Sequence, residues 1–259
     1  IAATEAKIRF SKKSDQLNLV SRVKQAEDIV KTLSELKGAA MKAGQLFSME
    51  FSDVLPEEVV QVLKKLHDKS TFMPFEQVES LLKKQIDPSE WKKISDLSQN
   101  PIAAASIGQV HSAKYGGEDV VFKIQYPGIA KSIDSDLAVL RKLAESLTAV
   151  QGKKIDYEEF FKALATNLKR EADYIREANS IKEFADLLKE LSVFRVPKVY
   201  ADISSKTVLA MSYENGMAMN EWIKIPKSPE QLSEFARNMI ELTLKEFFEW
   251  GVVQTDPNY

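Results

Sequence analysis

Residues 101–128 read PIAAASIGQVHSAKYGGEDVVFKIQYPG, and this stretch decides the fold. Two β-prone runs within it, QVHSAKY and DVVFKIQY, flank the short segment GGE. Gly116 and Gly117 can adopt the positive φ angles that tight hairpin turns need. The stretch therefore predicts a β-hairpin, and it leaves open what the alanine-rich residues before the hairpin do.

The alanine-rich residues follow the spacing of the phosphate-binding loop of protein kinases, G-x-G-x-x-G-x-V. The residues that would face a nucleotide in such a loop are Ala103, Ala104, Ala105, Ser106, Gly108 and Val110. Of the three glycines in the pattern, this stretch keeps the last, Gly108. Alanine retains the backbone N–H that binds phosphate but adds a methyl group, so we expect a stiffer and more crowded turn. The pattern by itself fits an ordinary hairpin equally well.

A lysine follows Gly108 at the spacing expected for a kinase. Lys123 lies in the run VVFKIQ, and it shares one face of the strand with Val121 because side chains alternate. Val121 would then cover an adenine while Lys123 reaches the α- and β-phosphates. The alternative is a hairpin lysine that faces solvent.

A strand lysine in such a site needs a carboxylate on a neighbouring helix to hold it. The segment LKREADYIREANS offers Glu171, Asp173 and Glu177. Asp173 and Glu177 are four residues apart and share a helical face, whereas Glu171 lies on another side. These acids also fit a solvated helix face that alternates with lysine and arginine.

Two later segments complete the order of a kinase. TVLAMSYENGM fits the strand whose end meets an adenine edge, with Met211, Ser212, Tyr213 and Glu214 as candidates. VVQTDPN places Asp256 after a short apolar run, where it would accept a hydroxyl proton or orient the nucleophile. A buried strand and an Asp-Pro turn are the plain structural interpretations, and the order of the motifs favours the functional one.

Helical spacing dominates the first ~95 residues. Helices are expected over 15–48, LPEEVVQVLKKLHDK, MPFEQVESLLKKQI, 132–150, 157–191 and SPEQLSEFARNMIELTLKEFFEWG. Strands are expected over the hairpin runs, FRVPKVYAD and KTVLAMSY, with a short strand in VVQTDPNY that leads into a loop. This order predicts an α+β fold with an antiparallel sheet.

The bulk composition excludes several classes of protein. The 259 residues are 44% hydrophobic, which suffices for a core, and the net charge of −2 gives no general attraction to nucleic acid. The absence of cysteine excludes a disulfide framework, and two histidines disfavour a structural zinc site. No apolar run is long enough to span a bilayer. The first residue, Ile1, and the ending QTDPNY suggest a fragment of a longer protein.

Taken together, the motifs resemble those of the UbiB-type atypical protein-kinase-like family, which is required for ubiquinone biosynthesis. KAGQLFS (Lys42–Ser48) matches the K-x-G-Q-x-x-S element of that family. AAASIGQVH, FKIQYPG, the E-x-D element EAD (Glu171–Asp173) and QTDPN match its other elements. The resemblance extends from about residue 15 to the end of the chain. The KAGQ element disfavours a small-molecule kinase of the antibiotic- or choline-phosphorylating type.

The resemblance implies a role for each matched residue. Lys123 would be the phosphate-side lysine, Glu177 its helix partner and Asp256 the catalytic-loop aspartate. Lys42, Gln45, Glu171 and Asp173 would belong to a helical extension over the site where a protein substrate otherwise docks. The metal-binding Asn and the Asp-Phe-Gly element would lie beyond Tyr259, so no metal ligand is expected within the chain itself.

The implied fold is a two-lobed protein-kinase-like fold of the α+β class with an N-terminal helical extension. We expect the extension at 1–97, an N-lobe with inserted helices at 98–214 and the start of a helical C-lobe at 215–259. The implied protein binds ATP or ADP with Mg²⁺ and acts as an ATPase or as a small-molecule or lipid phosphotransferase that supports ubiquinone biosynthesis. The alternative is a nucleotide-gated pseudokinase scaffold for a biosynthetic complex.

The implied partners are a nucleotide, quinone-biosynthesis proteins and lipid or quinone precursors, without nucleic acid. The implied location is the cytoplasm or the matrix side of mitochondria, with peripheral contact to a membrane.

Overall fold

The computed structural model describes residues 43, 46, 72–105, 107–150 and 156–254. The helices predicted over 15–48 and over LPEEVVQVLKKLHDK lie outside these residues, except that Ala43 and Leu46 are described and helical. Ala43 is buried in the main core.

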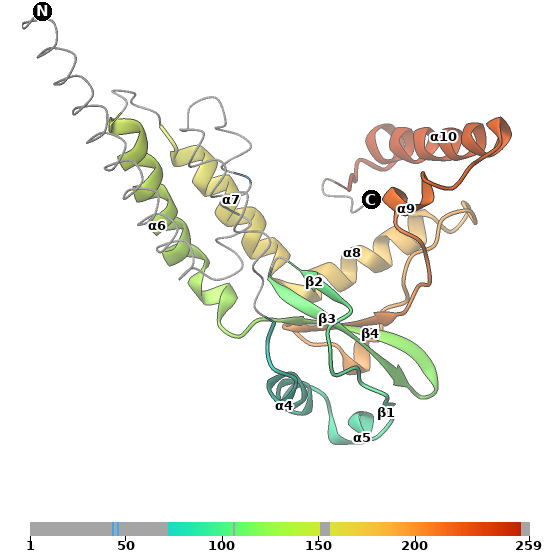
Figure 1. Cartoon of the computed structure of the whole chain (residues 1–259), viewed down its shortest axis with the longest axis horizontal. Helices are drawn as coiled ribbons and strands as arrows, with labels where there is room; N and C mark the ends of the chain where they lie inside the picture. Colours follow the sequence, from blue (N-terminus) through green and yellow to red (C-terminus); the bar gives the residue numbers. More distant parts are fainter. Residues whose placement is uncertain (1–42, 44–45, 47–71, 106, 151–155, 255–259) are drawn as a thin grey trace, which may run out of the picture.

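An antiparallel sheet forms the centre of the molecule (Figure 1). Its strands are β1 (Ile94–Ser95), β2 (Ala103–Ala105), β3 (Gly108–Tyr115), β4 (Glu118–Gln125) and β5 (Val208–Ser212). The order is β1-β3-β4-β5, with β2 paired to β3. The predicted hairpin is β3–β4, and its turn has positive φ at Gly116 (60°) and Gly117 (90°). The predicted α+β class with an antiparallel sheet is confirmed.

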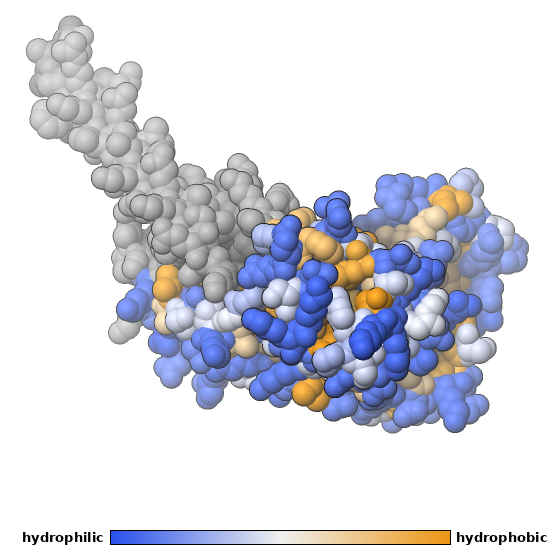
Figure 2. Space-filling model, turned by 90° about the horizontal axis from the view of Figure 1, so that it is seen from below, coloured by the Kyte–Doolittle hydropathy of each residue, from blue (hydrophilic) through white to orange (hydrophobic). Residues whose placement is uncertain are grey.

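The helices surround this sheet on several sides. They are α4 (Phe75–Gln85), α5 (Pro88–Trp91), α6 (Ile129–Val150), α7 (Glu158–Glu171), α8 (Tyr174–Leu187), α9 (Met219–Trp222) and α10 (Pro229–Leu244). In Figure 1, α6 and α7 lie side by side, α8 crosses the sheet from above, and α4 lies below it. Viewed from below, the described surface is mostly hydrophilic with separate apolar patches (Figure 2). Among the described helices, none is both long and apolar enough to cross a membrane.

The register of the strands gives the sheet two different faces. Residues directly opposite each other in antiparallel strands share a face, so Lys123 lies in one row with Val110 and Leu209. Val121 and Met211 form the next row on that face. The other face carries Phe122, Ile124 and Ala210, which belong to a core cluster with Val78 and Leu82 of α4. The sheet therefore separates two cores, and Lys123 faces the one that contains α7 and α8.

Three predicted elements differ from the structure. The helix predicted over 157–191 is two helices, because the Asp173 carboxylate accepts a hydrogen bond from the Arg176 N–H and so caps a new helix. FRVPKVYAD contributes a single bridge, Val199 to Met211, and a short 3₁₀ turn rather than a strand. Pro197 has no N–H to give to a ladder, which disfavours regular pairing there. Residues 252–254 form no strand.

The predicted long C-terminal helix forms, and it begins and ends at the capping residues that the sequence indicates. Ser228 and Gln231 form a reciprocal capping box, and Pro229 occupies the first turn. The helix continues as a π-helical turn, Lys245–Trp250, and ends at Gly251 with φ of 63°.

A buried polar network joins the segment before α4 to the sheet. Gln109 accepts a hydrogen bond from the Met73 N–H (2.7 Å) and donates to Nε2 of His111 (2.7 Å). Because the amide nitrogen of Gln109 only donates, Nε2 must accept, and Nδ1–H of His111 then donates to the Ser98 carbonyl (2.8 Å). This arrangement requires a neutral imidazole. Burial lowers the pKa of His111, against a smaller opposing effect of the Ser98 hydrogen bond.

We predict that this network makes stability depend on pH. Because the pKa of His111 is lowered by folding, the unfolded chain takes up a proton at His111 at a higher pH than the folded chain does. The contribution of neutral His111 to the free energy of unfolding is therefore complete above about pH 6.5 and is lost as the pH falls below that value. Urea unfolding should therefore give a lower free energy of unfolding for the unmodified chain at about pH 5.5 than at about pH 7.5. His111→Gln should be less stable at the higher pH and should depend less on pH. Parallel pH curves for the two proteins would contradict this assignment.

Candidate active site

The central feature of the site is an ion pair between the sheet and a helix. Lys123 Nζ on β4 lies 2.7 Å and 2.9 Å from the two carboxylate oxygens of Glu177 on α8. The side chains are 17% and 30% exposed, so the pair is partly withdrawn from water but open on one side. Hydrogen bonds between charged groups in such surroundings are stronger than those between neutral groups. The structure thus brings Lys123 together with Glu177, the one of the three candidate acids that the family resemblance implies as its partner.

The start of α8 is fixed to β4 by a second contact. Gln125 shares the face of Lys123 on β4 and donates a hydrogen bond to the Ala172 carbonyl (2.9 Å), at the joint between α7 and α8. Gln125 is buried. Glu177 lies one turn beyond this joint, so the joint determines how far the carboxylate is from Lys123. Sequence reasoning did not select Gln125, although its two-residue spacing from Lys123 was the signal.

Tyr174, the first residue of α8, is a further contact that sequence reasoning missed. Its ring lies under the ammonium group of Lys123, with 5.0 Å between Nζ and the ring centroid. It is completely buried, and a single buried aromatic in a helix gives no sequence signal that separates it from ordinary core.

The acidic residues around the joint have different environments. Asp173 caps α8 through its carboxylate. Glu171, the last residue of α7, is half-buried. Lys42, Gln45 and Asp256 lie outside the described residues. Ala43, between the two residues predicted from KAGQ, is buried in the core cluster that also holds Tyr174 and Leu209.

The alanine-rich stretch is a narrow hairpin. Ala105 pairs with Gly108, so only two residues form the turn between β2 and β3, of which Ser106 lies beyond what the structure describes. Ile107 is fully buried, and its carbonyl accepts the Tyr126 N–H (3.0 Å). Ala103 and Ala104 are exposed on β2. The stretch therefore forms a hairpin, and Val110 on its second strand lies opposite Lys123 of β4. Its role as a phosphate-binding loop stays a prediction.

Gly108 is required by close approach rather than by its φ angle. A Cβ at Gly108 would lie far inside van der Waals contact of the Ile124 carbonyl oxygen and 3.0 Å from the Tyr174 hydroxyl. Strand β3 can therefore approach β4 this closely at Gly108 only without a side chain.

The end of β5 brings an apolar side chain and two backbone amides close to the candidate site. Met211 lies opposite Val121 on the lysine face. The Ser212 N–H donates to the Lys198 carbonyl (2.8 Å) and the Tyr213 N–H to the Asp119 carbonyl (3.0 Å). These two amides are already bonded, so an adenine edge would have to use other backbone groups of this segment.

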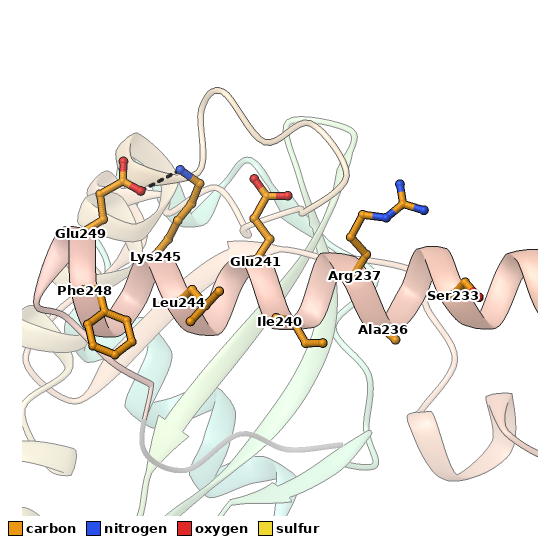
Figure 3. A pocket seen from close by; sticks show the side chains of 9 residues that line it. All are labelled: Ser233, Ala236, Arg237, Ile240, Glu241, Leu244, Lys245, Phe248 and Glu249. Carbon is orange, nitrogen blue, oxygen red and sulfur yellow. Dashed lines mark hydrogen bonds and ion pairs between the residues drawn. The ribbon is translucent and has the colours of Figure 1, made fainter.

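A surface hollow of the described part of the protein lies away from these residues. It has a volume of about 830 Å³, and all its lining residues come from α10 and the π-helical turn (Figure 3). Apolar side chains such as Ile240 and Phe248 point to one side of the helix, and a Lys245–Glu249 ion pair lies on the other. None of the predicted site residues lines it, so it is an exposed helix face rather than a candidate active site. Within the described residues, no three histidine or acidic side chains gather as metal ligands would.

A lysine on an antiparallel sheet, paired with a glutamate on a helix, is the arrangement found in protein-kinase-like proteins. Comparison with known proteins narrows this class. Residues 65–259 match the family model described as the ABC1 atypical kinase-like domain, and the chain therefore belongs to this family of atypical kinase-like proteins.

Relatives and a solved structure agree with this membership. The chain is 36% identical over 234 residues to atypical kinase COQ8, mitochondrial, of Saccharomyces cerevisiae, covering 89% of this chain and 46% of the relative. It is 34% identical over 235 residues to atypical kinase COQ8B, mitochondrial, of Danio rerio, covering 90% and 37%. The erythromycin complex of Rv3197 from Mycobacterium tuberculosis matches with a TM-score of 0.50 and 29% identity, covering 84% of this chain and 55% of that one. The chain thus spans less than half of the length of these two curated relatives.

We predict that Gly108→Ala destabilises the fold, because the added methyl group would collide with the backbone of β4. Overpacking of this kind typically costs roughly 1–3 kcal/mol. Gly216→Ala is the matched control, since nothing lies within 4 Å of its added Cβ, and surface changes usually stay within about 0.5 kcal/mol. Urea unfolding of both variants measures the difference. Equal stability of the two would mean that β3 and β4 do not approach as closely as described.

We also predict that Glu177→Gln lowers the stability of the fold more than the loss of an exposed surface ion pair does. It leaves a partly buried ammonium group without its anion, which costs roughly 1–3 kcal/mol. Glu79→Gln, which breaks the exposed 2.9 Å pair with Lys83, should cost about 1 kcal/mol or less. Adding Lys123→Met to Glu177→Gln should restore most of the loss, because both charges are then gone. A double variant as unstable as Glu177→Gln would contradict a direct pairing.

Proposed function

We propose that the chain forms the nucleotide-binding part of a protein that binds ATP with Mg²⁺ and uses it as an ATPase or as a small-molecule or lipid phosphotransferase. The observation that carries this proposal is the Lys123–Glu177 pair, because it holds an ammonium group at one place on the sheet, between the apolar residues Val110 and Leu209 of its row. A fixed cation of this kind suits the α- and β-phosphates of a nucleotide.

The other residues have complementary roles in the proposal. Val121 and Met211 offer an apolar surface for the adenine, next to the lysine row. The hairpin of Ala103–Ala105 and Gly108 would lie along the phosphates. Asp256, outside the described residues, would orient the acceptor or accept its proton. ATP supplies the phosphoryl group, and the surrounding residues bind and orient it.

The wider context of the function follows from the relatives. Two relatives are named as mitochondrial COQ8 proteins, and we propose that the present protein supports ubiquinone biosynthesis. Quinone-biosynthesis proteins and lipid or quinone precursors would then be its partners. The proposed location is the matrix side of mitochondria or the cytoplasm, with peripheral contact to a membrane.

A nucleotide-gated scaffold is the second candidate function. The narrow turn supports it, since Ile107 is buried and the exposed residues Ala103 and Ala104 carry methyl groups on the strand that leads into the turn. Such a turn would bind a nucleotide while slowing its reaction.

The test compares three variants of the intact protein in nucleotide binding and turnover with Mg²⁺. Lys123→Ala should weaken nucleotide binding on the order of tenfold or more, because a charge-assisted contact is lost. Asp256→Asn should keep the affinity and lose turnover. Lys114→Ala, a half-exposed lysine on the adjacent strand β3, is the matched control and should change neither.

The outcomes separate the two candidates. Normal turnover in Lys123→Ala and Asp256→Asn would mean that the proposed roles are wrong. Binding that depends on Lys123, without measurable turnover by the unmodified protein, would favour the scaffold over the enzyme.

A further inference from the structure

Tyr174 lies next to both partners of the ion pair, Lys123 on β4 and Glu177 on α8. It begins α8, and Glu177 follows three residues later on the same side of the helix. Its ring lies 5.0 Å from Lys123 Nζ, measured to the centroid, which is within the range of a cation–π interaction. The ammonium group therefore has two supports from one turn of α8, a carboxylate and an aromatic face.

The hydroxyl of Tyr174 lies near the alanine-rich hairpin. A Cβ at Gly108 would be 3.0 Å from this oxygen, so the absence of a side chain at Gly108 makes room for the tyrosine. The hydroxyl is buried and has no hydrogen-bond partner in the part of the chain that the structure describes. Burial, followed by the nearby charges of Glu177 and Glu171, raises the pKa of Tyr174. The hydroxyl thus stays neutral, and the residue meets Lys123 through the face of its ring.

The ring of Tyr174, and not its hydroxyl, is the part that the site uses. A phenylalanine would fill the same volume without burying an unpartnered hydroxyl, which normally costs stability. A leucine would fill the core without an aromatic face. What distinguishes the aromatic residue here is its position under a cation that is only 17% exposed, where a cation–π contact is stronger than at the surface.

We propose that Tyr174 is a positioning residue, whose ring sets where the Lys123 ammonium group stands between the Glu177 carboxylate and a bound nucleotide phosphate. The predicted effect of Tyr174 on nucleotide affinity rests on the proposed function. The position of the lysine itself does not depend on any nucleotide. Tyr174 and Gln125 together attach the first turn of α8 to β4, one through the lysine and the other through the Ala172 carbonyl.

The experiment compares Tyr174→Phe and Tyr174→Leu in the full chain, with Phe161→Leu as control. Phe161 is a buried aromatic residue of the same core, and its recorded ring partners are Tyr157 and Phe160 rather than Lys123. The first measurement is the NMR shift of the Lys123 ε-methylene protons without nucleotide, assigned by its loss in Lys123→Arg. A ring under the ammonium group moves this signal upfield. The second measurement is the affinity for ATP with Mg²⁺.

We expect Tyr174→Phe to keep the upfield shift and to bind ATP within about twofold of the unmodified chain. Tyr174→Leu should lose the shift and bind about three- to thirtyfold more weakly. Phe161→Leu should be less stable but should keep the shift and the affinity.

Two results would overturn the proposal. One is an unchanged Lys123 shift in Tyr174→Leu. The other is a loss of affinity in Phe161→Leu as large as that in Tyr174→Leu, which would make the effect one of core stability. If the unmodified chain binds no ATP, the proposed function fails, and the Lys123 shift still decides whether Tyr174 positions the lysine.

Discussion

The ion pair between Lys123 and Glu177 is the interaction on which the rest of the site depends. An ammonium group on an apolar sheet face is costly without a paired anion, and its neighbours in the row, Val110 and Leu209, are apolar. Glu177 supplies the anion only because α8 begins beside β4 and presents a side chain one turn along. The break between α7 and α8 is therefore a functional feature of the fold, since one continuous helix would not start at this place.

The alternation of side chains along β4 connects this ion pair to the two cores. Val121, Lys123 and Gln125 face α7 and α8, while Phe122 and Ile124 face α4. A slip of one residue in register would exchange the two sets and bury the lysine against α4. The register is held at one end by the Gly116–Gly117 turn and at the other by the close approach of β3 to β4 at Gly108. The glycines of the stretch thus fix the face on which the charge appears.

The sequence predicted what local signals encode and missed what long-range contacts decide. The hairpin, the face of Lys123 and the C-terminal helix follow from turn residues, alternation and capping. The pairing of Lys123 with Glu177 was implied by the family resemblance, because the two residues lie far apart in sequence and the residues alone left three candidate acids. The break at Asp173 was missed because its carboxylate was considered as a site acid and not as a helix cap. Tyr174 was missed because burial of an aromatic residue becomes informative only when its neighbour is known.

The distribution of alanine and glycine in the hairpin follows from the path of the backbone. Ala103 and Ala105 lie in β2, whose extended backbone accepts any residue, so alanine causes no strain there. Gly108 lies where β3 passes too close to Ile124 for any side chain. Alanine at the first two glycine positions of the kinase pattern is therefore compatible with the hairpin, and it changes the surface instead. In the proposed function, a phosphate that approached the turn would meet methyl groups on β2, so the turn would act on a nucleotide through crowding rather than through a loss of N–H groups.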